Sequence, residues 1–151
     1  MLKTKSLRLY FFVIILLGVF SFTTKVFAST VVTTDIATDT TWNLAGSPYV
    51  VQKSINVVVG ATLIIEPGVI VKFNVLAPNA GFGFSGLFVY GKMIAEGTAN
   101  NKIYFTSLWD DTIGGDTNGD GTATIPDPYT LYGYWRGVHF FSPEGEQSLK
   151  N

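Results

Sequence analysis

The 151-residue chain contains no cysteine and only one histidine, His139. It therefore has no disulfide, no thiol nucleophile and no set of histidines for a zinc site, and most hydrolytic triads lack their parts. His139 stands between two apolar residues in a strand-like run, where a lone histidine has a structural role. No catalytic residue and no organic cofactor site is predicted from the sequence.

Charged residues are scarce, at 14% of the chain, whereas 47% of the residues are hydrophobic, 15% are aromatic and 16 are glycine. This composition is typical of a β-rich protein with many tight turns and is too apolar for a disordered linker. Beyond residue 28 the chain has six basic and eleven acidic residues, a net charge of −5. That charge excludes a nucleic-acid-binding surface.

Residues 1–28 have the pattern of a cleavable signal peptide. Basic residues near the N-terminus precede an apolar run at 10–20, and Val26 and Ala28 put small residues at the −3 and −1 positions of a cleavage site. The apolar run of 11 residues is too short for a membrane-spanning helix, which needs about 20. We predict cleavage after Ala28, a secreted or cell-surface location and no membrane span.

Residues 29–41 are mostly polar and are predicted to form an extended lead-in, with the folded part beginning at Trp42. Seven short β-rich runs separated by turn residues follow, at 49–51, 55–59, 63–65, 69–73, 87–90, 103–105 and 138–141. Some are apolar throughout, which indicates burial on both faces or parallel stacking. The run 69–73 alternates instead, and this pattern places Lys72 on a solvent face.

A weak internal repeat has an offset of about 30 residues. The pattern at 58–60 and 66–73 recurs at 89–91 and 96–105. In such repeats each unit has a hydrophobic face that it buries by stacking on the next unit. The repeat favours stacked coils over a closed sandwich.

The stretches 42–51 and 60–73, and less specifically 91–107 and 135–140, resemble successive coils of bacterial right-handed parallel β-helix surface proteins. The resemblance implies an all-β, pectate-lyase-like solenoid, a fold that does not by itself define a function. Members of that family continue for many more coils, so the resemblance implies a truncated N-terminal portion. The expected organisation is a signal peptide at 1–28, a lead-in at 29–41, and coils at 42–151 with an acidic loop insertion at about 108–134.

The insertion contains the hexapeptide from Asp116 to Gly121, which reads D-x-N-x-D-G, the first half of a calcium loop. In such a loop alternate side chains turn oxygen atoms towards one centre, and a glycine at the sixth position permits a sharp turn. An aspartate at position 12 replaces the glutamate of an EF-hand and resembles the dockerin-type loop, although no amphipathic helix flanks this one. The predicted Ca²⁺ ligands are Asp116, Asn118, Asp120, Thr122 and Asp127.

The charge of the insertion favours the same prediction. Five aspartates fall within 18 residues that contain no lysine or arginine, and a divalent cation would offset their repulsion. The alternative is a solvated acidic turn whose asparagine and glycines serve the backbone conformation.

The leading functional hypothesis is a non-catalytic scaffold or adhesin segment whose loop binds structural calcium. Its expected partners are a surface polysaccharide, a host or cell-surface ligand, and further coils of a longer chain. One alternative is a calcium-dependent polysaccharide lyase with Arg136, the one arginine beyond residue 28, as its base. Another is a carbohydrate-binding module that uses the aromatic residues around the loop, which are Trp109, Tyr129, Tyr132, Tyr134 and Trp135.

Overall fold

The computed structural model describes residues 28–74, 85–121, 135–141 and 148–150. These residues form short strands and one 3₁₀ helix, η1 (Leu44–Gly46). The strands are β1 (Thr30–Val32), β2 (Thr40–Trp42), β3 (Tyr49–Val51), β4 (Ile55–Val57), β5 (Thr62–Ile65), β6 (Ile70–Phe73), β7 (Leu87–Val89), β8 (Lys92–Glu96), β9 (Tyr104–Ser107), β10 (Val138–Phe140) and β11 (Ser148–Lys150). The all-β fold class predicted from the sequence is confirmed.

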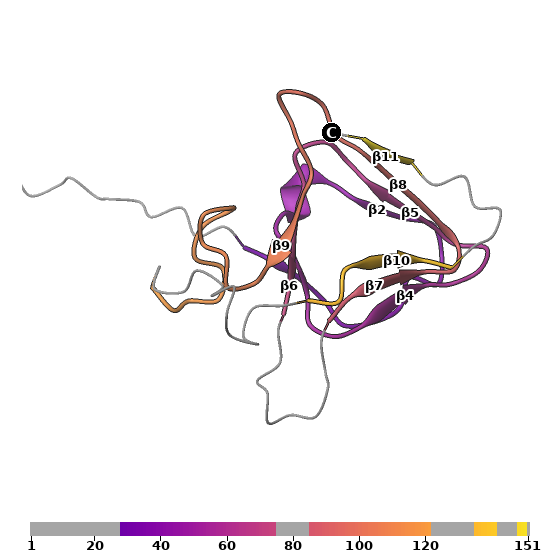
Figure 1. Cartoon of the computed structure of the whole chain (residues 1–151), viewed down its shortest axis with the longest axis horizontal. Helices are drawn as coiled ribbons and strands as arrows, with labels where there is room; N and C mark the ends of the chain where they lie inside the picture. Colours follow the sequence, from indigo (N-terminus) through magenta and orange to yellow (C-terminus); the bar gives the residue numbers. More distant parts are fainter. Residues whose placement is uncertain (1–27, 75–84, 122–134, 142–147, 151) are drawn as a thin grey trace, which may run out of the picture.

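The strands form three sheets in which every described pairing is parallel. Sheet A has the order β1-β3-β6-β9, sheet B the order β10-β7-β4, and sheet C the order β11-β8-β5-β2. From β3 onwards the chain visits the three sheets in turn and then returns to the first, one strand further along. The sheets surround a common core on three sides (Figure 1).

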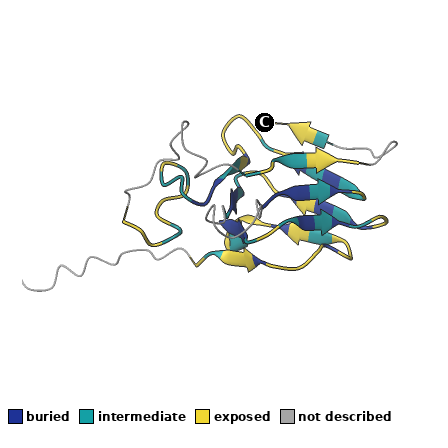
Figure 2. Cartoon of the chain, turned by 60° about the horizontal axis from the view of Figure 1, so that its bottom comes forward, coloured by how far each residue is buried: buried dark blue, intermediate teal, exposed yellow. Residues whose placement is uncertain are grey.

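The core consists of the side chains that point inward from each strand. Because the parallel strands are in register, inward residues stand above one another from layer to layer: Val51 pairs with Phe73, and Leu63 with Met93. All four are fully buried. Complete burial of such a side chain contributes about 1.5–3 kcal/mol, so these columns hold the sheets together. In Figure 2 the buried residues are concentrated in the strands in the middle of the stack.

Close approach of neighbouring layers requires glycine at one corner between sheets B and C. The amides of Tyr90 and Gly91 both donate hydrogen bonds to the Val57 carbonyl, which brings Gly91 against the layer before it. A Cβ atom on Gly91 would collide with the carbonyl oxygens of Val58 and Ala61. This turn leads directly into β8.

The corner between sheets A and B carries connections of increasing length. Residues 52–54 link β3 to β4, residues 74–86 link β6 to β7, and residues 108–137 link β9 to β10, which amounts to three, thirteen and thirty residues. At the base of the corner the Asn74 side-chain amide donates to Gln52 Oε1 at 2.6 Å. The three connections therefore begin and end at the same edge of the stack.

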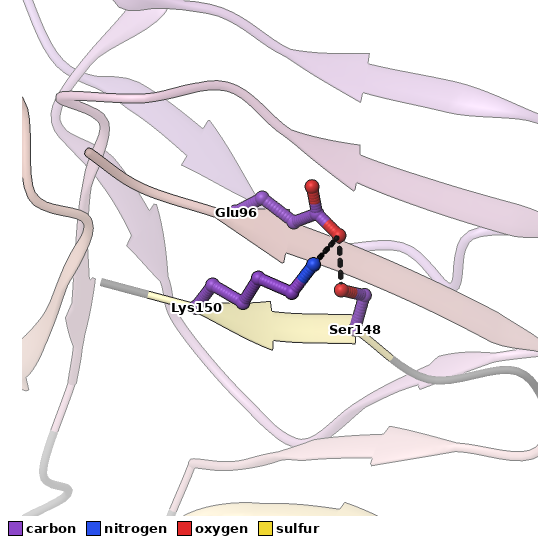
Figure 3. A network of polar contacts seen from close by, with 3 residues as sticks. All are labelled: Glu96, Ser148 and Lys150. Atoms are coloured by element: carbon purple, nitrogen blue, oxygen red, sulfur yellow. Dashed lines mark hydrogen bonds and ion pairs between the residues drawn. The ribbon is translucent and has the colours of Figure 1, made fainter.

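Strand β11 lies at the edge of sheet C and pairs with β8. The Glu96 carboxylate accepts a hydrogen bond from the Ser148 hydroxyl and lies 3.5 Å from the Lys150 ammonium (Figure 3). All three side chains come from these two strands, and they reinforce the backbone pairing at the surface.

The folded part begins earlier than the sequence predicts. Residues 29–41 do not precede the fold, because β1 pairs with β3, β2 pairs with β5, and Ile36 forms a parallel bridge with Val57. Val32 and Ile36 are buried, so the polar stretch supplies a complete first layer with few apolar anchors.

The predicted run 49–51 coincides with β3, and each of the other six runs overlaps a strand. Strands β1, β2, β8 and β11 were not among the predicted runs. Of the predicted signal peptide at 1–28, residues 1–27 lie outside the described residues. None of the helical structure in the described ranges is long and apolar enough to cross a membrane.

Candidate metal centre

The acidic loop leaves sheet A after β9 and turns back over the outer face of β6. The Leu108 amide donates to the Phe73 carbonyl at 2.8 Å, which ties the start of the loop to the sheet. Gly114 lies directly over β6, since a Cβ atom there would be 3.0 Å from Ile70 Cδ1 and 3.6 Å from Lys72 Cε. In Figure 1 this segment is the orange loop that projects beyond β9.

The hexapeptide from Asp116 to Gly121 closes around the carboxylate of its first residue. Asp116 Oδ1 accepts hydrogen bonds from the amides of Gly119 at 2.7 Å and Asp120 at 3.1 Å, and Oδ2 accepts one from Gly121 at 3.0 Å. Gly119 and Gly121 have φ values of 79° and 85°, in the left-handed region that glycine adopts at least cost. The pattern of glycines therefore builds a turn whose backbone wraps one carboxylate.

Three carboxylates converge beside this turn. Asp111, Asp116 and Asp120 each offer an oxygen atom, and the three oxygens lie within 4.8 Å of one another. Both carboxylate oxygens of Asp111 are buried and have no hydrogen-bond partner among the described residues. Burial raises the pKa of Asp111, and the charges of Asp120 and Asp116 raise it further. An unpaired carboxylate in this position is costly unless a cation compensates it.

Lys72 reaches the loop from β6 and is fully buried, so the predicted solvent face at this position is wrong. Its ammonium group donates to the carbonyl oxygens of Asp110 at 2.9 Å and Gly115 at 2.7 Å. Burial lowers the pKa of Lys72, while the charges of Asp111, Asp110 and Asp116 act in the opposite direction. The loop has no basic residue of its own, but the fold supplies one from the sheet beneath it.

Asp110 belongs to the scaffold of the loop and not to the cluster. One of its carboxylate oxygens accepts a hydrogen bond from the Thr106 hydroxyl, and the other accepts bonds from the amide and hydroxyl of Thr112. Burial by itself would raise the pKa of Asp110, but these hydrogen bonds, together with the charge of Lys72, lower it overall. Its oxygens are therefore already engaged.

Of the five predicted ligands, Asp116 and Asp120 lie in the cluster. Asn118 lies beside it and donates through its side-chain amide nitrogen to Asp120 Oδ2 at 2.6 Å, so its amide oxygen would have to rotate inward to bind a cation. Thr122 and Asp127 lie outside the described residues.

Asp111 was not predicted as a ligand, because it precedes the hexapeptide and has no position in the calcium-loop numbering. The only signal for it in the sequence is its membership of the acidic run.

The donor set fits a hard divalent cation. Ca²⁺ takes six to eight oxygen ligands at about 2.3–2.6 Å, so two oxygens on the same ion are separated by at most roughly 5 Å. The oxygen atoms of Asp111, Asp116 and Asp120 meet that limit. They could supply part of the coordination shell of such an ion, and backbone carbonyls or water would have to complete it.

Of the other residues singled out in the sequence, His139 and Trp135 make ring-stacking contacts. The His139 ring stacks on Phe88 with centroids 5.2 Å apart, and its Nε2 lies 2.6 Å from the Arg136 carbonyl oxygen. Trp135 stacks on the core residue Phe73. Tyr129, Tyr132 and Tyr134 lie outside the described residues. Within the described ranges Lys72, and not Arg136, is the basic side chain seen bonded to the acidic loop.

Comparison with protein-family models, curated proteins and solved structures finds no match to this chain. The resemblance to β-helical surface proteins stays a prediction that rests on the residues quoted for it.

Proposed function

We propose that this chain is the N-terminal portion of a right-handed parallel β-helix that acts outside the cell as a non-catalytic scaffold or adhesin segment. In this proposal the acidic loop binds one structural calcium ion, and the stack presents its loops to a surface polysaccharide or a host or cell-surface ligand. Further coils would continue the stack in a longer chain.

The topology of the sheets supports the solenoid. From β3 to β11 consecutive strands fall in sheets A, B and C in strict rotation, and each strand pairs in parallel with the strand three places later. A closed sandwich or a barrel does not produce this order, whereas a chain that winds around one axis does. In-register columns such as Ile55 with Leu87 are also typical of stacked coils.

The observation that carries the calcium proposal is the carboxylate of Asp111, which has no hydrogen-bond partner among the described residues and lies beside Asp116 and Asp120. An isolated acidic turn would leave its carboxylates pointing into water, where their repulsion is screened. Here one carboxylate is withdrawn from solvent next to two others, and only one basic side chain meets the described part of the loop. A bound Ca²⁺ would balance the remaining charge and satisfy the Asp111 oxygens.

Location outside the cell is consistent with such a site. Calcium sites of extracellular modules bind with dissociation constants of about 10⁻⁴–10⁻³ M, which suits a small set of carboxylates in an exposed loop. A chain without cysteine cannot use disulfides, so packing and a bound ion remain as its means of stabilisation. Within the described ranges no specific contact favours the lyase or the carbohydrate-module alternative.

The direct test is calcium titration of the protein from Ser29 onward, followed by isothermal calorimetry and thermal unfolding. At a calcium concentration 100 times the dissociation constant, one site adds about 2.7 kcal/mol to the free energy of unfolding. For a chain of this size that corresponds to a rise in Tm of roughly 10 °C. No binding heat and no change in Tm at 10 mM calcium would refute the calcium site.

Asp111→Asn is the variant that isolates the site, since the Asp111 oxygens accept no hydrogen bond among the described residues and exchange of the carboxylate for a neutral amide breaks no contact of the turn. We expect this variant to lose most of the calcium-dependent rise in Tm. Glu66→Gln is the matched control, because it removes an exposed carboxylate outside the loop and should leave the calcium response unchanged.

Export is tested separately by expressing the chain with its own leader and sequencing the N-terminus of the secreted product. A mature protein that begins at Ser29 is expected. Retention of the full leader on a cell-associated product would contradict cleavage after Ala28.

A further inference from the structure

The Lys72 ammonium joins two points of the acidic loop that are five residues apart in sequence. It donates one hydrogen bond to the Asp110 carbonyl and one to the Gly115 carbonyl. The arc between these two carbonyls contains Asp111, and it ends one residue before Asp116. Lys72 therefore closes the segment that brings the first carboxylate of the cluster towards the other two.

The position of Lys72 in the sheet gives this contact its rigidity. Lys72 lies on β6, between β3 and β9 in sheet A, and its backbone is paired on both sides with Val50 and Thr106. Its side chain is buried along its whole length beneath Gly114. A lysine ammonium has three donors, and hydrogen bonds in which one group is charged are stronger than those between neutral groups. Two such bonds are sufficient to hold a short arc.

The charge acts in the same direction as the hydrogen bonds. Asp110, Asp111 and Asp116 all interact with the Lys72 ammonium. Without it, the carboxylates would repel one another at close range, and the loop would relieve this repulsion by opening. One resident positive charge offsets part of the repulsion and leaves negative charge for a divalent ion.

We propose that Lys72 is the positioning residue of the candidate calcium site, and that it holds the loop closed and the three carboxylates together before any ion arrives. This inference rests on the proposed calcium site for its functional meaning. The site is then preorganised, so calcium adds stability to a loop that already has its shape. Binding would involve little reordering of the chain.

The alternative is that Lys72 only fills space under the loop through its aliphatic stem. Lys72→Met separates the two, because methionine keeps the length and the apolar stem and removes the donors and the charge. Lys53→Met is the matched control, since Lys53 is an exposed lysine on the turn between β3 and β4. Amide exchange of Leu87 and Tyr104 reports whether the sheets of each variant remain folded.

The test measures amide hydrogen exchange at Gly119, Asp120 and Gly121 by NMR, in EDTA and in 10 mM calcium. In wild type and in Lys53→Met we expect nearly equal exchange in both conditions. In Lys72→Met we expect exchange in EDTA at least about tenfold faster, as the loss of two hydrogen bonds to a charged group implies, and a return towards wild type in calcium.

Equal exchange of Lys72→Met and wild type in EDTA, with the sheet amides protected, would overturn the positioning role. So would a variant that binds calcium by calorimetry without regaining protection. Failure of the calcium site itself has a different signature, namely the absence of binding heat in wild type, and the comparison in EDTA still decides whether Lys72 holds the loop.

Discussion

Phe73 and Trp135 stack face to face, with ring centroids 4.1 Å apart and ring planes inclined by 3°. Phe73 is a fully buried residue at the end of β6, immediately before the connection 74–86 begins. Trp135 stands near the end of the connection 108–137, where the chain approaches β10. The stack therefore fixes the far end of the longest connection to the core.

Trp135→Ala is expected to lower the free energy of unfolding by about 3 kcal/mol, because it removes a partly buried ring and the stacking contact of that ring with Phe73. Trp135→Phe should recover most of that loss. Urea unfolding of both variants measures the difference. If Trp135 were mainly a platform for sugars, Trp135→Ala would leave stability unchanged and abolish binding to polysaccharide.

Gly91 and Gly60 are each required for a different reason, the first for lack of space and the second for its backbone conformation. Gly91→Ala places a methyl group against the carbonyl oxygens of Val58 and Ala61, so it should destabilise by about 3 kcal/mol through overpacking. Gly60 has open space around it but a φ of 87°, so Gly60→Ala should cost only about 1–2 kcal/mol of backbone strain. Thermal unfolding of the pair ranks the two effects. A larger loss for Gly60→Ala would contradict the tight approach at Gly91.

The polar first layer contributes stability that depends on pH. Asp35 accepts hydrogen bonds from the side-chain amide of Asn56 at 3.0 Å and from its backbone amide at 2.9 Å, and these bonds lower the pKa of Asp35 below 3.8. The stabilisation is complete above the unfolded pKa of 3.8 and is lost as pH falls through the lower folded value.

Asp35→Asn should therefore be less stable than wild type at pH 7, by less than about 1 kcal/mol because the pair is exposed. The difference should shrink as the pH falls below the unfolded pKa of 3.8, since the wild-type carboxyl group becomes protonated as the pH passes its lower folded value. Chemical unfolding of both proteins across this range measures it. A difference that does not depend on pH would mean that the charge of Asp35 is irrelevant.

The two ends of the stack differ in how far their inward apolar side chains are exposed. At the β1 end the inward residues Val32 and Ile36 are buried, whereas at the opposite end Phe140 and Leu149 are 37% and 54% exposed. Among the described strands, β9, β10 and β11 lie at that edge, and an exposed parallel edge with apolar residues behind it promotes association. Leu149→Lys should reduce self-association in sedimentation experiments, and Val31→Lys at the opposite end should not.

Much of the fold was predictable because its determinants are local. The run 49–51 is apolar throughout and became β3, buried along its whole length. Strand β8 was missed because its central alternation is framed by the charged residues Lys92 and Glu96. The first layer was missed because residues 29–41 contain few apolar residues, and its burial depends on the layer that covers it.

Part of the candidate site could likewise be predicted from the sequence, and part of it could not. The turn around Asp116 could be predicted from the spacing of its aspartates and glycines, which act over six residues. The role of Lys72 could not, because its partners lie 38 and 43 residues further along the chain and meet it only when β6 and β9 pair. The alternating pattern of its strand predicted a solvent-exposed side chain for Lys72. The acidic loop, which returns over β6, covers that side chain instead.

The corner between sheets A and B has accepted connections of three, thirteen and thirty residues without disturbing the registers that flank it. The entropy of closing a flexible loop rises by only about 0.6 kcal/mol for each doubling of its length, so added chain at this corner has a small thermodynamic penalty. Each layer thus offers a place where residues can be inserted without loss of the strand pairing. The stack is in this sense a frame on which recognition loops can diversify independently of the core.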